Sequence, residues 1–87
     1  MSPELDTLDQ LLGGDLPLST IRRNFRDDRR FAHAIVEMLN DGQVILRTAA
    51  GETVAPWQWR VLVEGITDES AASHWLSLTP AGARYVC

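Results

Sequence analysis

The clearest pattern of apolar and polar positions lies in "DRRFAHAIVEMLNDG", where five apolar residues recur at the spacing of one face of a helix. They are Phe31, Ala34, Ile35, Met38 and Leu39. We therefore predict a helix over about 28–41, with Gly42 at its end. Its opposite side collects polar residues and one valine: Arg29, Arg30, His33, Val36, Glu37 and Asn40.

A first helix is expected near the start of the chain. Ser2 is placed to cap it and Pro3 to begin it, because proline suits the first helical position. Its apolar side is expected to be formed by four leucines: Leu5, Leu8, Leu11 and Leu12. Gly13-Gly14 ends this helix. The following "DLPL" is an extended connector, since Pro17 disfavours helix at the residue before it.

A second, short helix is expected to begin near Ser19, whose hydroxyl can cap it. Ile21 and Phe25 lie four residues apart and so share its inner side. Asp27 and Asp28 then interrupt the pattern. Either can cap the next helix, because an acid suits the positive end of the helix dipole.

After Gly42 the period changes to that of strands. "QVILRT" is rich in β-branched residues and predicts a strand, and "AAGE" predicts a turn. In "WQWRVLVE" the alternating residues Trp57, Trp59, Val61 and Val63 predict a second strand with one apolar face. "GITDESAAS" is expected to be a polar loop. "HWLSLT" predicts a third strand, followed by a short helix that Thr79 caps and Pro80 begins.

This order of elements resembles a winged helix-turn-helix domain. "LPLSTIRRNF" matches its positioning helix, and "DDRRFAHAIVEMLNDGQVIL" matches a recognition helix that runs into the first wing strand. "WLSLTPAGARYV" is similar to the closing wing strand and next helix of MarR-like and PadR-like bacterial regulators. The expected fold is one α+β domain over 1–87, with three helices, a two- to three-stranded antiparallel sheet and a short C-terminal helix.

Two features depart from that pattern. The segment from about Ala49 to Ser73 is longer than a minimal wing and is expected to hold an extra strand. The sequence also shows no long C-terminal helix of the kind through which many such regulators dimerise. A homodimer is therefore expected to pair through Trp57 and Trp59 or through the last helix.

Composition fits a small globular domain, with 87 residues of which 45% are hydrophobic and 23% charged. The acidic N-terminus lacks the basic region and apolar core of a signal peptide. No apolar run approaches the roughly 20 residues that span a bilayer. We therefore expect a cytoplasmic protein without membrane contact. The single cysteine, Cys87, allows no internal disulfide and is expected to have no reactive or metal-binding role.

The basic residues are unevenly distributed. All eight are arginines, and five of them fall within the nine residues "RRNFRDDRR", although the whole chain has a formal charge of −4. The five are Arg22, Arg23, Arg26, Arg29 and Arg30. This concentration indicates that one face of an acidic protein can meet an anionic partner. Arginine also suits forked contact with phosphate and guanine.

The resemblance implies roles for these residues in binding duplex DNA. The N-terminal end of the helix over 28–41 would enter the major groove, with Arg29, Arg30 and His33 toward the bases. Phosphates would be met from the preceding helix and the wing: Ser19, Thr20, Arg22, Arg23, Arg26 and Arg47. Glu37, on the same face, can accept from a cytosine amine or repel the backbone. The expected function is sequence-specific DNA binding by a small bacterial transcriptional regulator.

The same residues also have interpretations without DNA. The arginines can pair with Asp27, Asp28 and Glu37 on a solvated corner, where each ion pair contributes only about 0–1 kcal/mol. His33 can be an ordinary exposed histidine, and His74 is better explained as a strand-end residue than as a ligand. Asp27-Asp28 is better explained by helix capping than by a metal-binding or catalytic role.

The tryptophans indicate a second class of function. Trp57, Trp59 and Trp75 either complete a small core or form a partly exposed face that binds a protein partner or a second copy. The alternative function is a winged-helix protein-interaction module that uses its Trp-bearing sheet and does not bind DNA. The sequence shows no nucleophile motif, phosphate-binding glycine loop or metal-ligand spacing. We expect no enzyme activity, cofactor or metal.

Overall fold

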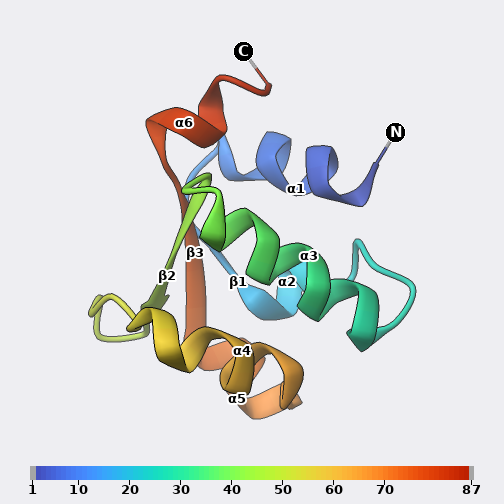
Figure 1. Ribbon diagram of the computed structural model, residues 1–87, viewed down its shortest axis with the longest axis vertical. Coiled ribbons are helices and arrows are strands. Elements are labelled where there is room, and N and C mark those ends of the chain that lie inside the picture. The colour runs from blue at the N-terminus through green and yellow to red at the C-terminus, as the bar shows by residue number, and fades with distance from the viewer. Residues whose placement is uncertain (1, 87) are drawn as a thin grey trace.

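The computed structural model describes residues 2–86, which form six helices and a three-stranded antiparallel sheet (Figure 1). The helices are α1 (Pro3–Leu11), α2 (Leu18–Arg22), α3 (Asp28–Asn40), α4 (Pro56–Glu64), α5 (Asp68–Ser73) and α6 (Pro80–Ala83). The strands are β1 (Leu16–Pro17), β2 (Val44–Thr48) and β3 (His74–Leu78). The chain thus mixes helices and antiparallel strands, as an α+β fold does. The expectation for Cys87 lies outside the described residues.

α1 begins as predicted but buries a different side. The Ser2 hydroxyl accepts the Leu5 N–H at 3.1 Å, and Pro3 opens the helix. Leu8 and Leu11 are buried, whereas Leu5 and Leu12 are exposed, so the expectation of a four-leucine inner side is wrong. Thr7 takes the inner position instead: it is fully buried, and its hydroxyl donates to the Pro3 carbonyl at 2.8 Å. That bond satisfies the hydroxyl and allows a polar residue to face the core.

α2 begins at Leu18, so Ser19 is not its cap. The extended connector predicted at "DLPL" continues as β1 to Pro17, which occupies the N-cap position without a side-chain bond. Leu18 and Ile21 are both fully buried. Burial of Leu18 fixes where α2 starts, and Ser19 becomes a half-buried residue of its first turn.

α3 matches the prediction. The Asp27 carboxylate accepts the Arg30 N–H at 2.8 Å and caps the helix. The predicted stripe is buried without exception: Phe31, Ala34, Ile35, Met38 and Leu39. This helix supplies a larger share of the core than any other described helix, and its opposite face is left to solvent.

β3 is the central strand of the sheet, with β1 on one side and β2 on the other. Leu76 of β3 lies opposite Leu16 of β1 and Leu46 of β2 in the antiparallel register. Leu46 and Leu76 are buried, and they form the sheet's part of the core. Beyond β2, a single bridge joins Arg47 to Thr53 after the turn at Gly51, whose φ of 89° favours glycine.

The predicted strand over 57–64 is wrong, because this segment is the helix α4. Pro56 occupies the first turn, and the indole N–H of Trp59 donates to the Val54 carbonyl at 3.1 Å. Within α4, Val63 is buried and Trp59 and Leu62 are partly buried, and Ile66, just after the helix, is buried too. Trp57 and Trp59 therefore do not belong to the sheet, and the interpretation of a Trp-bearing sheet holds only for Trp75 of β3.

The expected polar loop after α4 also contains a helix, α5. Thr67 and Ser70 cap it reciprocally, each side chain bonding the backbone N–H of the other. Ala71 is fully buried, which fixes α5 to the core. The segment between β2 and β3 thus adds two helices, not the single extra strand that we predicted.

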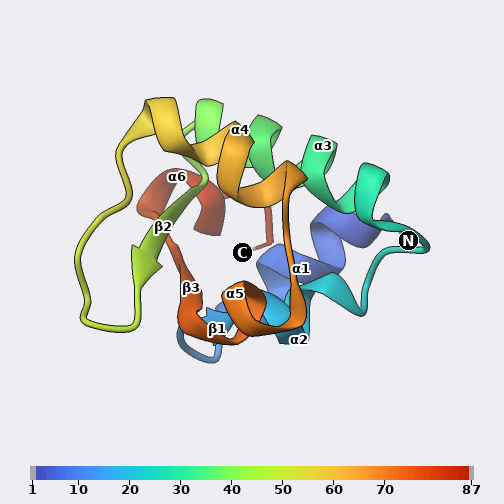
Figure 2. The same cartoon turned by 90° about the horizontal axis from the view of Figure 1, so that it is seen from below.

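α4 packs against α3, and the two helices form one layer of the molecule (Figure 2). Near the C-terminus, α6 packs closely on Gln43, in the short segment that joins α3 to β2. A Cβ atom at Gly82 would lie 2.1 Å from the Gln43 carbonyl oxygen, so only glycine fits there. The Thr79 hydroxyl caps α6 as predicted, accepting the Gly82 N–H at 3.1 Å.

Candidate nucleic-acid interface

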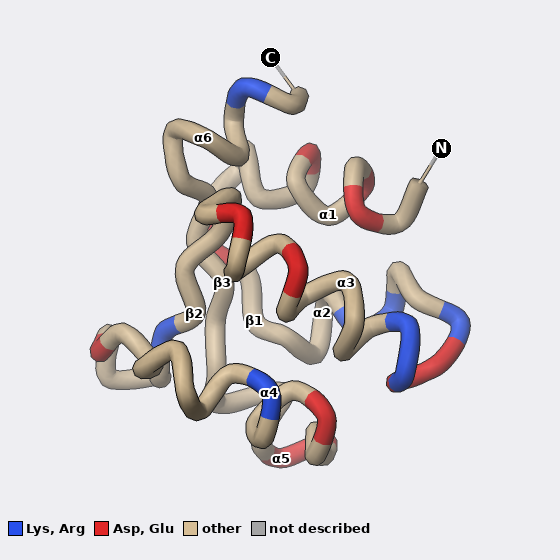
Figure 3. Tube along the Cα trace, in the orientation of Figure 1, with Lys and Arg blue, Asp and Glu red and all other residues tan. Residues whose placement is uncertain are grey.

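Five arginines surround the turn between α2 and α3, and we call this set the arginine corner: Arg22, Arg23, Arg26, Arg29 and Arg30. The turn projects beyond the end of α4 at one edge of the molecule (Figures 1 and 2). Basic and acidic residues alternate along it (Figure 3). The corner is therefore accessible to a large partner, and its charges decide what that partner can be.

Contacts with α1 and α3 hold the backbone of this turn. The Asn24 side-chain amide donates to the Gln10 side chain at 3.2 Å and accepts from it at 3.1 Å. Asn24 also donates to the Thr7 hydroxyl at 3.1 Å. The ring of Phe25 lies edge-on to that of Phe31, with centroids 5.7 Å apart. The arginines consequently project from a fixed backbone.

The two aspartates of the turn have structural roles. Of the two predicted capping candidates Asp27 caps α3, while Asp28 receives a forked contact from Arg22. Among residues 2–86, no group of three or more histidines, aspartates, glutamates or cysteines is placed to hold a metal ion.

Arg22 forms ion pairs with two carboxylates. Its Nε and Nη2 atoms donate to Asp28 at 2.8 Å each, and its Nη1 atom donates to Asp68 of α5 at 2.9 Å. The hydrogen bond and charge of Asp28 raise the pKa of the Arg22 guanidinium, and the same bond lowers the pKa of the Asp28 carboxyl. Arg22 was expected to meet DNA phosphate, but in this structure it joins α2, α3 and α5.

The other four arginines are exposed. Arg30 approaches Asp27 only loosely, with its Nε atom 3.9 Å from the carboxylate. Arg23, Arg26 and Arg29 form no ion pair with any residue in the range 2–86. The corner therefore retains three guanidinium groups without a carboxylate partner and a fourth that is weakly paired.

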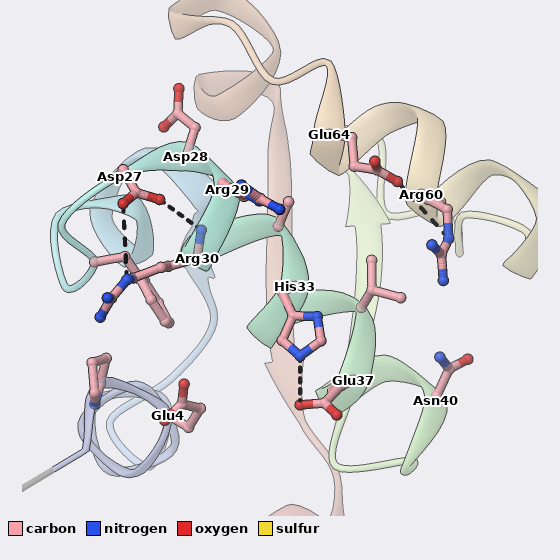
Figure 4. Close-up of a pocket in the computed structure, with 14 residues that line it drawn as sticks. Glu4, Asp27, Asp28, Arg29, Arg30, His33, Glu37, Asn40, Arg60 and Glu64 are labelled. Carbon is pink, nitrogen blue, oxygen red and sulfur yellow. Dashed lines mark hydrogen bonds and ion pairs between the residues drawn. The ribbon is translucent and has the colours of Figure 1, made fainter.

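The exposed face of α3 lines an open groove between the start of α1 and α4 (Figure 4). His33 lies 3.5 Å from Glu37 on the next turn, and Arg60 of α4 lies 3.8 Å from Glu64. The groove is lined by five carboxylates and three guanidinium groups: Glu4, Asp27, Asp28, Glu37, Glu64, Arg29, Arg30 and Arg60. Its net charge is negative, and the two arginines that α3 contributes, Arg29 and Arg30, both lie in its first turn, beside Asp27 and Asp28.

The remaining predicted contact residues are divided between two places. Ser19 borders a small pocket with Arg22, Arg23 and Arg26, while Thr20 is half-buried beside it in α2. Arg47 lies in β2, where its Nη1 atom donates to the Gly51 carbonyl at 3.3 Å. β2 and the arginine corner lie on opposite sides of the molecule in Figure 1. Arg47 therefore does not belong to the corner.

The tryptophans do not form one patch. Trp57 is 79% exposed on α4, next to Val61, which is 78% exposed one turn later. Trp59 is partly buried, and Trp75 is 37% exposed on β3 beside Pro17 and Arg47 of the neighbouring strands. His74, at the start of β3, contacts the Ser70 carbonyl through its Nδ1 atom at 2.8 Å. Its place agrees with the expected strand-end role.

Three residues that position the site had no predicted role. Asp68 reaches Arg22 across 46 positions, and Gln10 reaches Asn24 across 14. Asn24 lies within "RRNFRDDRR", but no pattern in the sequence assigns its partners.

Comparisons of the chain with protein-family models, with curated proteins and with solved structures give no match. In the described part of the chain, no helix has the length and apolar character needed to cross a bilayer.

Proposed function

We propose that this chain binds duplex DNA through the arginine corner, as a winged helix-turn-helix domain with two helices inserted in its wing. The observation that carries the proposal is the set of exposed arginines Arg23, Arg26 and Arg29, which form no ion pair within residues 2–86 and lie on or directly after a turn that contacts α1 and α3. The element order supports it. α2 and α3 follow one another across the turn at 23–27, in the order expected of a helix–turn–helix, and antiparallel strands β2 and β3 come after them.

The proposed docking places the N-terminal turn of α3 in the major groove. In helix-turn-helix proteins this end of the second helix contacts base edges, while the first helix crosses the backbone. Arg29 then faces the bases, where a guanidinium can fork onto guanine. Arg23 and Arg26 lie before α3 and would meet phosphates. A role in transcriptional regulation belongs to this proposal.

The charge of the groove limits the proposed footprint. The Glu37 carboxylate lies farther along α3, and Glu64 ends α4 close to the N-terminal half of α3 (Figure 4); both repel phosphates. The major groove is about 12 Å wide and admits one helix, so α3 and α4 cannot enter it together. We therefore expect the basic end of α3 alone to enter, with modest affinity that falls steeply as salt rises.

The test is duplex binding by fluorescence anisotropy over a salt series. We expect Arg29→Ala to weaken binding to a selected duplex by about 1–3 kcal/mol and to relax its sequence preference. Arg23→Ala should weaken binding to all duplexes alike and lower the salt slope by about one unit.

Arg84→Ala is the matched control, because it removes the same charge from an exposed site outside the corner. It should leave binding near that of the wild type. Absence of duplex binding by the wild type at about 50 mM salt would exclude the proposal. Equal binding by all three variants and the wild type would exclude it too.

One observation favours a second candidate, self-association through α4. Trp57 and Val61 are almost fully exposed on one side of the helix, with Arg60 and Glu64 beside them. Two antiparallel copies of α4 would cover the apolar pair and bring Arg60 of one copy toward Glu64 of the other. Sedimentation equilibrium of the wild type and of Trp57→Ala tests this. A dimer that the substitution dissociates supports it, and a monomeric wild type at high concentration excludes it.

A further inference from the structure

We propose that Asp68 of α5 competes internally with DNA phosphate for Arg22, so that the segment inserted between β2 and β3 lowers the affinity of the arginine corner. This inference rests on the proposed function, because it concerns the strength of the same interface. It assigns a role to a residue of "GITDESAAS", the segment for which the sequence predicted only a polar loop.

The geometry around Arg22 supports the competition. Arg22 ends α2, the helix that crosses the phosphate backbone in the proposed docking. Its side chain is 26% exposed, and its Nη1 atom contacts the Asp68 carboxylate at 2.9 Å. A phosphate oxygen would take the same kind of charge-assisted hydrogen bond at the same donor. Asp68 therefore occupies the position on Arg22 that a phosphate would use.

The two carboxylates on Arg22 are not equivalent. Asp28 holds the guanidinium by two bonds from its place in the first turn of α3. Asp68 makes one bond, its side chain is fully exposed, and it belongs to the inserted helix. An exposed single-bond ion pair is weak and easily exchanged. Asp68 is thus the partner that a phosphate can displace while Asp28 keeps Arg22 in place.

Positive and negative side chains are equal in number around Arg22, so the loss of one carboxylate should change DNA affinity measurably. Three guanidinium groups and three carboxylates line the small pocket beside α2: Arg22, Arg23, Arg26, Asp27, Asp28 and Asp68. Removing the charge of Asp68 turns this balanced set positive. A neutral amide at position 68 would also hold the Arg22 Nη1 donor less strongly than the carboxylate does.

The experiment compares Asp68→Asn with Glu69→Gln in duplex binding over a salt series. Both substitutions remove one exposed negative charge from the same turn of α5, but in residues 2–86 Glu69 pairs with no arginine. We expect Asp68→Asn to raise affinity about five-fold near 50 mM salt and to steepen the salt slope by about one unit, as one added phosphate contact does. Glu69→Gln should raise affinity less and leave the slope unchanged.

A second pair of variants identifies Arg22 as the residue released. In an Arg22→Ala background, Asp68→Asn should give no more gain than Glu69→Gln. Circular dichroism of every variant checks that the fold is retained. If the wild type binds no duplex, the proposed function fails and this inference fails with it. If the wild type binds and the two α5 variants behave alike, only the internal competition is overturned.

Discussion

α3 and α4 lie side by side in one layer, yet they depend on the rest of the molecule in different ways. α3 buries six of its thirteen residues and is capped by the Asp27 side chain. α4 buries one of its nine residues, Val63, and has no side-chain cap. The outer face of α3 is polar and charged, whereas α4 exposes Trp57 and Val61.

The difference indicates which helix can carry a precise site. A helix with a continuous buried stripe and a capped start keeps its side chains in fixed positions. α4 depends on contacts supplied by others, among them the bond from Trp59 to Val54 and its packing on α3. Two residues of the arginine corner, Arg29 and Arg30, belong to this well-buried helix, and the other three lie just before it. The following substitutions test the contrast, from the largest expected effect to the smallest.

The largest effect is expected from truncating the buried stripe of α3. Ile35 is fully buried, and Ile35→Ala should lower the free energy of unfolding by about 2–5 kcal/mol. Val63→Ala, the matching change in α4, should lower it by about 2 kcal/mol, because one carbon atom fewer is removed from the core. Urea denaturation measures both. Equal losses at the two positions would mean that α4 is as integral to the core as α3.

The next largest effect on stability is expected from removing the N-terminal cap of α3. Asp27→Ala removes the acceptor of the Arg30 N–H and should cost about 0.5–2 kcal/mol in thermal denaturation. Asp41→Ala is the control at the other end of the helix, where an acid opposes the dipole. It should be neutral or slightly stabilising. A loss at Asp41 as large as that at Asp27 would contradict a specific role for the cap.

A pH titration tests how the start of α3 is joined to α2. The bond from Arg22 lowers the pKa of Asp28, so the carboxylate is more stable in the folded than in the unfolded chain. Its contribution is present above the ordinary pKa of about 3.9 and is lost as pH falls through the lower folded value. The stability difference between wild type and Asp28→Asn should therefore shrink from about pH 5 to about pH 2. A difference that stays constant over this range would exclude the linkage.

The smallest effect is expected at Trp57. Its side chain is almost fully exposed, so Trp57→Ala should change the free energy of unfolding by less than about 0.5 kcal/mol. Trp59→Ala, two residues later, should cost more because it removes partly buried apolar surface and the bond to Val54. A large loss at Trp57 would show that the outer side of α4 is needed for folding.

The contrast between α3 and α4 also explains which elements the sequence predicts. The apolar residues of α3 follow one period, that of a helix, and the residues at this spacing are buried. The segment over 57–64 carries two patterns. Trp57, Trp59, Val61 and Val63 alternate as in a strand, while Trp59, Leu62, Val63 and Ile66 follow helical spacing. The helical set is the one that packs inward, and contacts with distant residues decide between the two.

The contacts of the candidate site also differ in whether the sequence predicts them. The sequence predicts that Asp27 or Asp28 caps α3, because the capping bond is local, and the structure assigns the cap to Asp27. The pairs of Arg22 with Asp68 and of Gln10 with Asn24 join separate elements, and no local signal marks them. A count of charges along the chain therefore overestimates the free positive charge at the corner. Arg22 is paired with Asp28 of α3 and also with Asp68 of α5, a helix that the sequence did not predict.

The edges of the small sheet have a consequence for behaviour at high concentration. β1 is two residues long and ends in Pro17, which has no N–H to offer a further strand. The outer side of β2 is already engaged, because Val54 donates to the Leu46 carbonyl and Arg47 bridges Thr53. Neither edge presents the row of free N–H and C=O groups that templates edge-to-edge aggregation. Growth of this sheet into fibrils is therefore blocked from both sides while the fold is intact.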